Sequence, residues 1–306
     1  MGLDVRLLLW REAEVSTVKK YKAVFFDWDG TAVMSRKAPV DDAVTAMAPL
    51  LDAGVKLAII SGTTIENIAG GEIEKYFTEK QLKNLYLGLG RGAYNYMFQE
   101  GKPCCFENRI PDGKTLLDVH RICFDIHLEL KEKYGLDTDI VFSRPNYCKI
   151  DLMVNSGRGD NLFLQENELE LLKKVMAEHG MEGGIRQLMD LADEIGKKYQ
   201  IALVPTCDAK YLEAGISSKS DNVDTIFRRI QEEEGIKPEE CAYWGDEYVG
   251  IEEGIFGSDS FMHTPVTAAG DFFDVSEIDS KDRPEWVKII GGGVDSFLEF
   301  LWGQSA

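Results

Sequence analysis

The feature that most constrains the fold is a short apolar run that ends in two acidic residues. Residues 21–26 are too short for a helix and rich in aromatic and β-branched side chains, which is typical of a buried strand. Asp27, Asp29 and Gly30 follow, so charge is expected at the carboxyl edge of a sheet, where open α/β folds bind ligands. Two carboxylates this close repel each other unless a cation lies between them or one is protonated. The alternative is an ordinary Asp-Gly turn with both acids in solvent.

Three later stretches also place polar groups at the ends of apolar or helical segments. They are Ser61-Gly62 after the apolar run 55–60, Lys219 ahead of a helical pattern, and Asp246-Glu247 after the apolar residues 242–244 and Gly245. Together with the stretch 27–31, this ordered set resembles the four motifs of the haloacid dehalogenase (HAD) superfamily, which consists chiefly of phosphatases and phosphotransferases. The Asp-x-Asp-Gly-Thr form of residues 27–31 resembles the phosphatase branch of that superfamily.

The spacing of these stretches predicts an inserted domain. Asp27 and Ser61 are 34 positions apart, which suits one helix and one further strand of a parallel sheet. Ser61 and Lys219 are 158 positions apart, far more than a crossover needs. We therefore expect an α/β fold with three segments: a core of residues 1–93 and 206–306 and an inserted α+β domain of residues 94–205. By resemblance, the core is a Rossmann-like HAD core, and the insertion is the large type-2 cap of sugar-phosphate phosphatases and phosphomannomutase relatives.

Periodicity predicts most of the remaining elements. The helical patterns lie at about 64–77, 115–134, 162–179, 183–197 and 294–302, and further strands are expected at 94–98, 140–143, 147–154, 200–204, 254–261 and 287–290. Within the inserted domain, residues 143–149 and Arg158 carry polar and basic groups that are candidates for choosing a substrate. Their alternative is plain solvent exposure, as for most surface arginines and lysines.

The resemblance implies a role for each motif residue. Asp27 would be the nucleophile that forms an aspartyl-phosphate, and Asp29 the general acid and base. Ser61, Gly62 and Lys219 would bind the phosphate oxygens. The alternatives are helix N-capping by Ser61 and an ordinary solvated lysine at position 219.

A hard cation with oxygen ligands fits the acidic cluster, and Mg²⁺ is the expected cofactor. The expected ligands are Asp27, the backbone carbonyl of Asp29, Asp246 and, as a substitute acid, Glu247. Many family members carry a second acid four residues after the aspartate of the fourth motif, and this chain has Gly250 there. Glu252 and Glu253 are further candidates for the missing acid.

Composition limits the partners. The net charge of −19 and the lack of any Lys/Arg run longer than a pair argue against nucleic acid and anionic membranes. The six cysteines show no Cys-x-x-Cys pair, which favours reduced thiols and a cytoplasmic protein. The apolar stretch Leu7–Trp10 is too short for a signal peptide or a membrane span. The expected partner is a small phosphorylated metabolite, and the oligomeric state stays open.

These observations lead to one main hypothesis and two alternatives. The hypothesis is a Mg²⁺-dependent phosphomonoester hydrolase that works through an aspartyl-phosphate, with a small sugar phosphate as the substrate class that the resemblance implies. The first alternative is a phosphomutase or phosphotransferase that uses the same intermediate. The second is a catalytically weak protein that binds a phosphorylated ligand, which the altered fourth motif motivates.

Overall fold

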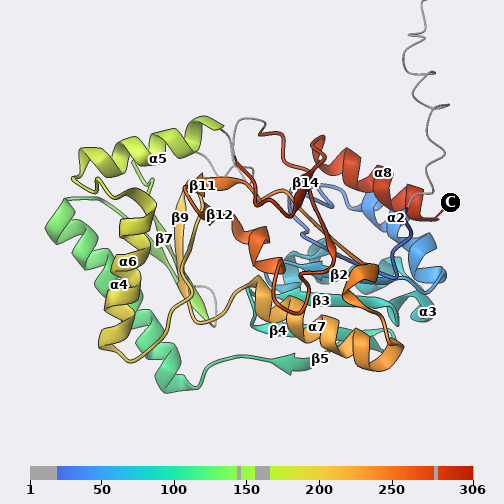
Figure 1. The fold of residues 1–306 in the computed structure, drawn as a ribbon. Helices are drawn as coiled ribbons and strands as arrows, with labels where there is room; N and C mark the ends of the chain where they lie inside the picture. Colours follow the sequence, from blue (N-terminus) through green and yellow to red (C-terminus); the bar gives the residue numbers. More distant parts are fainter. Residues whose placement is uncertain (1–18, 143–145, 156–165, 279–281, 306) are drawn as a thin grey trace, which may run out of the picture.

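The computed structural model describes residues 19–142, 146–155, 166–278 and 282–305. Figure 1 shows a larger body built around a long sheet and a smaller body in which α4, α5 and α6 lie beside a second sheet. No helix among the described residues is long and apolar enough to cross a membrane.

The larger body contains a sheet of eight described strands in the order β14-β13-β10-β1-β2-β3-β4-β5. The strands from β14 to β3 run parallel, and β4 and β5 extend that sheet in antiparallel fashion. The strands span β1 (Ala23–Phe26), β2 (Lys56–Ile60), β3 (Leu85–Leu89), β4 (Tyr94–Gln99), β5 (Lys102–Asn108), β10 (Cys241–Gly245), β13 (Asp271–Asp274) and β14 (Val287–Ile289). All residues of β1, β2, β3 and β10 are buried, as expected for parallel strands covered on both faces.

Helices cover both faces of this sheet, and the alternation of side chains along β1 decides which residue meets which helix. Val24 and Phe26 pack in one cluster with residues of α2 (Asp41–Asp52) and α8 (Gly293–Ser305). Phe25 points to the opposite face, where α7 (Lys219–Glu234) supplies the apolar partners. The core is therefore a three-layer α/β structure with β1 near its centre.

The smaller body is the α+β part of the chain. Its antiparallel sheet has the order β6-β7-β9-β8, with β6 (Asp139–Val141), β7 (Tyr147–Asp151), β8 (Thr206–Cys207) and β9 (Tyr211–Gly215). Its helices are α4 (Gly113–Tyr134), α5 (Glu166–Glu178) and α6 (Gly184–Lys198), which share one apolar cluster with the sheet. We call this body the cap. Its other sheet face turns toward the core, where side chains of β7 and β9 line a cavity together with core residues.

Several predicted elements differ from the observed ones. The stretch 64–77 forms three short 3₁₀ helices, η1 (Ile65–Asn67), η2 (Ala69–Gly71) and η3 (Ile73–Tyr76), because a glycine pair at 70–71 is unfavourable inside a helix. No strand forms at 200–204. The stretch 254–261 forms β12 (Ile255–Phe256), which pairs with β11 (Gly250–Glu252), and then η5 (Ser258–Met262). The core strand that was expected at 254–261 lies further along the chain, as β13. Two short helices, α3 (Glu79–Leu82) and η4 (Pro238–Glu240), complete the described elements.

Sheet membership also bears on the predicted domain boundaries. Strands β4 and β5, which were expected in the inserted domain, belong to the central sheet, and β8 and β9 belong to the cap sheet. Local sequence patterns identify a strand but not its pairing partner, so these strands could not be assigned correctly from periodicity. We propose that the inserted domain begins near residue 109 and ends near residue 216.

Candidate active site

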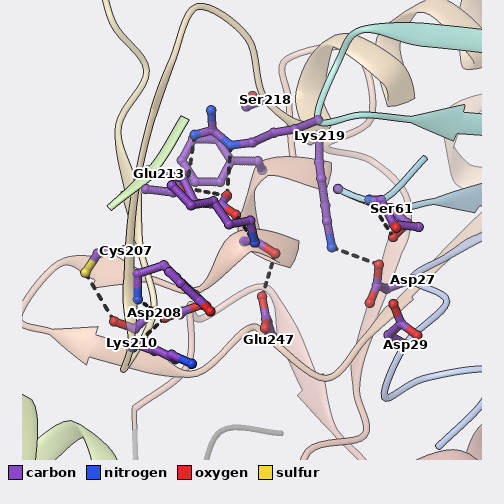
Figure 2. A pocket seen from close by; sticks show the side chains of 18 of the residues that line it. Asp27, Asp29, Ser61, Cys207, Asp208, Lys210, Glu213, Ser218, Lys219 and Glu247 are labelled. Atoms are coloured by element: carbon purple, nitrogen blue, oxygen red, sulfur yellow. Dashed lines mark hydrogen bonds and ion pairs between the residues drawn. The ribbon is translucent and has the colours of Figure 1, made fainter. Parts of the chain in front are cut away.

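Three neighbouring strands of the central sheet bring the predicted site residues together. Asp27 follows β1, Ser61 follows β2, and Asp246 follows β10, and these strands are adjacent in the order β10-β1-β2. Asp27 is held in register because its backbone N–H donates to Trp244 O at 3.0 Å. Figure 2 shows Lys219 reaching toward Asp27, with Asp29 and Ser61 nearby. The carboxyl edge of the sheet is therefore a polar site, as the sequence predicts.

Lys219 is buried between two aspartates. Its Nζ lies 3.0 Å from Asp27 Oδ1 and 2.7 Å from Asp259 Oδ1, and its side chain is only 6% exposed. Ser218 caps α7 at the preceding position, which places Lys219 in the first turn of the helix. Burial alone would lower the pKa of Lys219, but Asp259 and Asp27 outweigh it and raise that pKa well above its usual value. The alternative of a solvated lysine does not hold for this side chain.

Asp27, Asp246 and Asp259 form one acidic cluster. Each offers a carboxylate oxygen, and these three oxygens lie within 4.8 Å of one another. Asp246 is fixed by Thr31 Oγ1, which donates to its Oδ1 at 2.9 Å. The backbone of Gly30 passes so close that a Cβ there would overlap the Asp246 carboxylate, and its φ of +93° also favours glycine. The Gly30 position therefore permits the approach of the first acidic motif to the fourth.

Asp259 is the member of this cluster that the sequence did not predict. It lies on η5, is fully buried, and its Oδ2 accepts a hydrogen bond from Glu247 N at 2.8 Å. A Cβ at Gly245 would overlap the Asp259 side chain, so the glycine before Asp246 makes room for it. Asp259 comes 13 positions after Asp246, outside any short motif, and its only sequence signal is a polar stretch where a strand was expected.

Glu247, the predicted substitute acid, and Gly250, the position that lacks the second acid of the fourth motif, both lie outside this cluster. The carboxylate of Glu247 accepts a hydrogen bond from Ser258 Oγ at 2.6 Å and lines the cavity. Gly250 lies at the start of β11, and its N–H donates to Asp282 O. The geometry therefore differs from the expectation that Glu247 replaces the missing acid, because Asp259 holds the position beside Asp27 and Asp246.

Asp29 lines the site and forms an ion pair with Arg36. Arg36 Nη2 is 3.2 Å from Asp29 Oδ2, whereas the buried Oδ1 has no hydrogen-bond partner among the described residues. Burial raises the pKa of Asp29, and Arg36 acts in the opposite direction. Burial also raises the pKa of Asp27, opposed by Lys219 and reinforced by Asp259. A carboxyl group with a raised pKa and an unpaired oxygen is suited to proton transfer.

Ser61 and Gly62 form a short turn at the end of β2. Ser61 is 4% exposed, and its Oγ accepts a hydrogen bond from Thr63 N at 3.3 Å. The residue that precedes η1 is Thr64, so Ser61 is not the N-cap of a helix. Gly62 O accepts a hydrogen bond at 3.0 Å from Tyr147 Oη, which comes from the cap. The turn therefore connects the core site to the cap.

A cavity of about 160 Å³ extends from the acidic cluster to the cap. Its cap side is formed by β7 and the β8–β9 hairpin, and Figure 2 shows Asp208, Lys210 and Glu213 across the cavity from Asp27 and Asp29. Of the predicted cap residues, Lys149 lines the cavity. Asn146 is buried and donates to Arg91 O at 3.0 Å. Residues 143–145 and Arg158 lie outside the described residues.

Arg91 joins core and cap beside this cavity. Its guanidinium donates to Ser217 O at 2.8 Å and to Val204 O at 2.6 Å, and its Nε lies 3.2 Å from Glu213 Oε2. Only 3% of its surface is exposed. Sequence reasoning missed Arg91, because its partners come from a segment more than a hundred positions away.

Comparisons with known proteins bear on the fold. No protein-family model matches the chain, and no curated protein matches it. Among solved structures, the chain is similar to an N-terminally truncated IMP-nucleotidase of Plasmodium falciparum, at 13% identity and a TM-score of 0.55, over 93% of this chain and 71% of that one. An IMP-bound mutant of that nucleotidase gives 14% identity and a TM-score of 0.58, over 94% and 68% of the two chains.

A third similar structure is the sucrose-phosphatase of Synechocystis sp. PCC6803 in complex with sucrose and phosphate. The identity is 13% and the TM-score 0.51, over 92% of this chain and 97% of that one. At such identities the likeness shows the fold. It confirms the prediction of an α/β fold in which a Rossmann-like core carries a cap.

Proposed function

We propose that this protein is a Mg²⁺-dependent phosphomonoester hydrolase that acts on a small sugar phosphate through an aspartyl-phosphate on Asp27. The observation that carries the proposal is the buried contact of Lys219 with Asp27 and Asp259 at the carboxyl end of β1. In this contact a carboxylate and a cation lie side by side at the edge of the central sheet, which supports a nucleophilic role for Asp27. Structures similar in fold bear the names IMP-nucleotidase and sucrose-phosphatase, which agrees with hydrolysis of a phosphate ester.

The donor set of the acidic cluster fits Mg²⁺. Asp27, Asp246 and Asp259 offer carboxylate oxygens, which Mg²⁺ prefers, and they lie close enough to repel one another without a cation. We propose these three side chains as its ligands, with the backbone carbonyl of Asp29 as predicted from the sequence. The carboxylates of the site outnumber its two cations, Lys219 and Arg36, so these cations alone do not neutralise a bound phosphate. The ion would supply the missing positive charge.

In the proposed first step, an oxygen of the Asp27 carboxylate attacks phosphorus and the bond from phosphorus to the leaving oxygen breaks. Asp29 gives its proton to that oxygen, which leaves as an alcohol. In the second step, Asp29 takes a proton from water, and the resulting hydroxide attacks phosphorus to release inorganic phosphate and free Asp27. Lys219 and the Ser61 hydroxyl bind the other phosphate oxygens and stabilise the charge that develops on them.

The alternatives use the same residues differently. A phosphomutase would pass the phosphoryl group of Asp27 back to a sugar hydroxyl, so labelled water would leave little label in free phosphate. A weak phospho-ligand binder would bind phosphate without turnover. The cavity between core and cap is compatible with all three functions, and the rate of phosphate release distinguishes them.

The test is release of phosphate from p-nitrophenyl phosphate with Mg²⁺, with EDTA, and in the variant Asp27→Asn. We expect release that needs Mg²⁺ and falls by at least about 1,000-fold in Asp27→Asn, because the amide cannot form the covalent intermediate. The matched control is Asp190→Asn, an exposed aspartate of α6, which should retain full activity. Absence of release from the folded wild-type protein with Mg²⁺ present would refute the proposal.

A further inference from the structure

We infer that the cap side of the cavity binds an uncharged, polyhydroxylated leaving group, and that Lys149 is the residue that selects it. The inference rests on the proposed function, because it concerns the part of the substrate that carries the phosphate. Its basis is a cluster of four charged cap and junction residues that no catalytic step uses: Arg91, Lys149, Asp208 and Glu213.

These four charges balance one another. Glu213 lies between two cations, with Lys149 Nζ 2.7 Å from its Oε1 and Arg91 Nε 3.2 Å from its Oε2. Burial would raise the pKa of Glu213, but Lys149 and Arg91 outweigh it and lower that pKa to about 2. Asp208 faces the same cavity and adds a second negative charge near Lys149. Lys210 also lines the cavity, and its Nζ lies 3.6 Å from Asp151 Oδ2. Counted with that pair, three cations and three carboxylates leave the cap side of the cavity without net charge.

The core side of the cavity is different. Asp27, Asp29 and Glu247 line it with Lys219 and Arg36, and Asp246 and Asp259 add further carboxylates behind them. This excess of acids suits a metal ion with a phosphate dianion. The two ends of the cavity therefore match a molecule that is charged at one end and neutral at the other.

The cap groups are arranged as hydrogen-bonding partners for hydroxyl groups. An ammonium has three N–H donors, and Lys149 spends one on Glu213 while 28% of its side chain remains exposed in the cavity wall. Asp208 is held rigidly, since its Oδ1 accepts hydrogen bonds at 2.6 Å from both Lys210 N and Tyr211 N. A carboxylate accepts more than two hydrogen bonds. Two adjacent hydroxyl groups can accept a hydrogen bond from the Lys149 ammonium and donate one to the Asp208 carboxylate.

The same wall is poorly suited to a nucleobase. The ring centroid of Tyr211 lies 5.1 Å from Lys149 Nζ and 5.0 Å from Lys210 Nζ, so ammonium groups cover ring surface that a base would need for stacking. Phe261 is the other aromatic ring that lines the cavity among the described residues, and one ring serves a sugar face as well as a base.

A second anionic group on the substrate is disfavoured by the carboxylates. Glu213 and Asp208 would repel it, and Lys149 is already neutralised by Glu213. Removing the charge of Glu213 would leave the cap side with a net positive charge. Replacing Lys149 should therefore weaken binding of the hydroxylated leaving group, whereas replacing Glu213 should shift the preference toward a substrate with a second anionic group.

The experiment compares kcat/KM for four probes: glucose 6-phosphate, fructose 1,6-bisphosphate, IMP and p-nitrophenyl phosphate, which has no hydroxyl groups to bind. In the wild-type protein we expect glucose 6-phosphate to exceed IMP and the bisphosphate by at least about 10-fold. Lys149→Met should lower the ratio of glucose 6-phosphate to p-nitrophenyl phosphate by about 10- to 100-fold, mainly through KM, which is the effect of losing a hydrogen bond from a charged donor. Lys174→Met, an exposed cap lysine, should leave every value unchanged.

Glu213→Gln provides the opposite readout. It should raise the ratio of kcat/KM for the bisphosphate to kcat/KM for glucose 6-phosphate, because Lys149 then carries an unbalanced charge. A variant that merely misfolds would lower kcat/KM for both substrates. Cleavage of p-nitrophenyl phosphate together with a preference for IMP, or a Lys149→Met variant with an unchanged ratio, would overturn the inference and leave the proposed function standing. Absence of release from every probe would overturn both.

Discussion

Replacement of Asp259 by asparagine tests which acid completes the metal site. In the absence of metal, two opposing effects are expected to cancel. At an effective dielectric constant near 20, like charges no more than 4.8 Å apart repel by at least about 3.5 kcal/mol, so loss of the Asp259 charge relieves at least about 7 kcal/mol against Asp27 and Asp246. The lost attraction to Lys219 at 2.7 Å is about 6 kcal/mol on the same scale. The metal-free variant should therefore fold with nearly wild-type stability.

With Mg²⁺ the variant and the wild-type protein should differ. An ion present at about 100 times its Kd stabilises the folded state by about 2.7 kcal/mol, which raises Tm by about 5 °C in a chain of this length. Loss of a carboxylate ligand should weaken binding by at least about 10- to 100-fold, a factor that even outer partners of a metal contribute. At the same Mg²⁺ concentration, the gain in Asp259→Asn then falls to between about 0.4 and 1.4 kcal/mol, or about 1–3 °C.

Calorimetric melting of EDTA-treated protein, with and without added Mg²⁺, measures this gain without reference to activity. Glu247→Gln is the matched control, because its carboxylate lies outside the cluster and bonds Ser258 Oγ. It should keep the full Mg²⁺-dependent rise in Tm. A full rise in Asp259→Asn would show that Asp259 is not a ligand, and loss of the rise in Glu247→Gln would show that Glu247 is one. Either result would contradict the assignment of Asp27, Asp246 and Asp259 as the ligands.

Two further results are expected. Gly30→Ala should abolish phosphate release and the Mg²⁺-dependent rise in Tm together, because the added methyl group overlaps Asp246; a variant that retains both would contradict the close approach. The lowered pKa of Glu213 should stabilise the protein above about pH 4.5 and lose that effect as the pH falls toward 2. Between pH 5 and pH 3, urea denaturation should show the wild-type protein losing about 2 kcal/mol more than Glu213→Gln, and parallel losses would refute this account.

The sequence predicted the parts of the site that depend on local order along the chain. An apolar run followed by acids fixes Asp27 and Asp29 at the edge of a sheet, and Ser61 and Asp246 follow by the same reasoning. Lys219 was predicted from the resemblance of its surroundings to a motif, since nothing in its neighbours signals burial. The three-layer core was predictable because buried parallel strands and amphipathic helices have distinct periodicities.

The remaining features depend on tertiary contacts that periodicity does not encode. Asp259 enters the acidic cluster only because η5 packs beside α7 and β10. The strands β8 and β9 were not predicted, and only their pairing with each other and with β7 assigns them to the cap. Arg91 looks like part of a glycine-rich loop until Val204, Glu213 and Ser217 come to surround it.

The order of strands in the central sheet has a consequence for biosynthesis. β1 pairs with β2 on one side soon after both have left the ribosome, but its other neighbour is β10, with Ala23 and its partner Cys241 separated by 218 positions. Until β10 is made, after more than three quarters of the chain, the side of β1 away from β2 is an unprotected sheet edge. Asp246 and Asp259 arrive on that late segment. A nascent chain therefore completes its acidic cluster at the moment it closes this edge, and one that stops short would lack both.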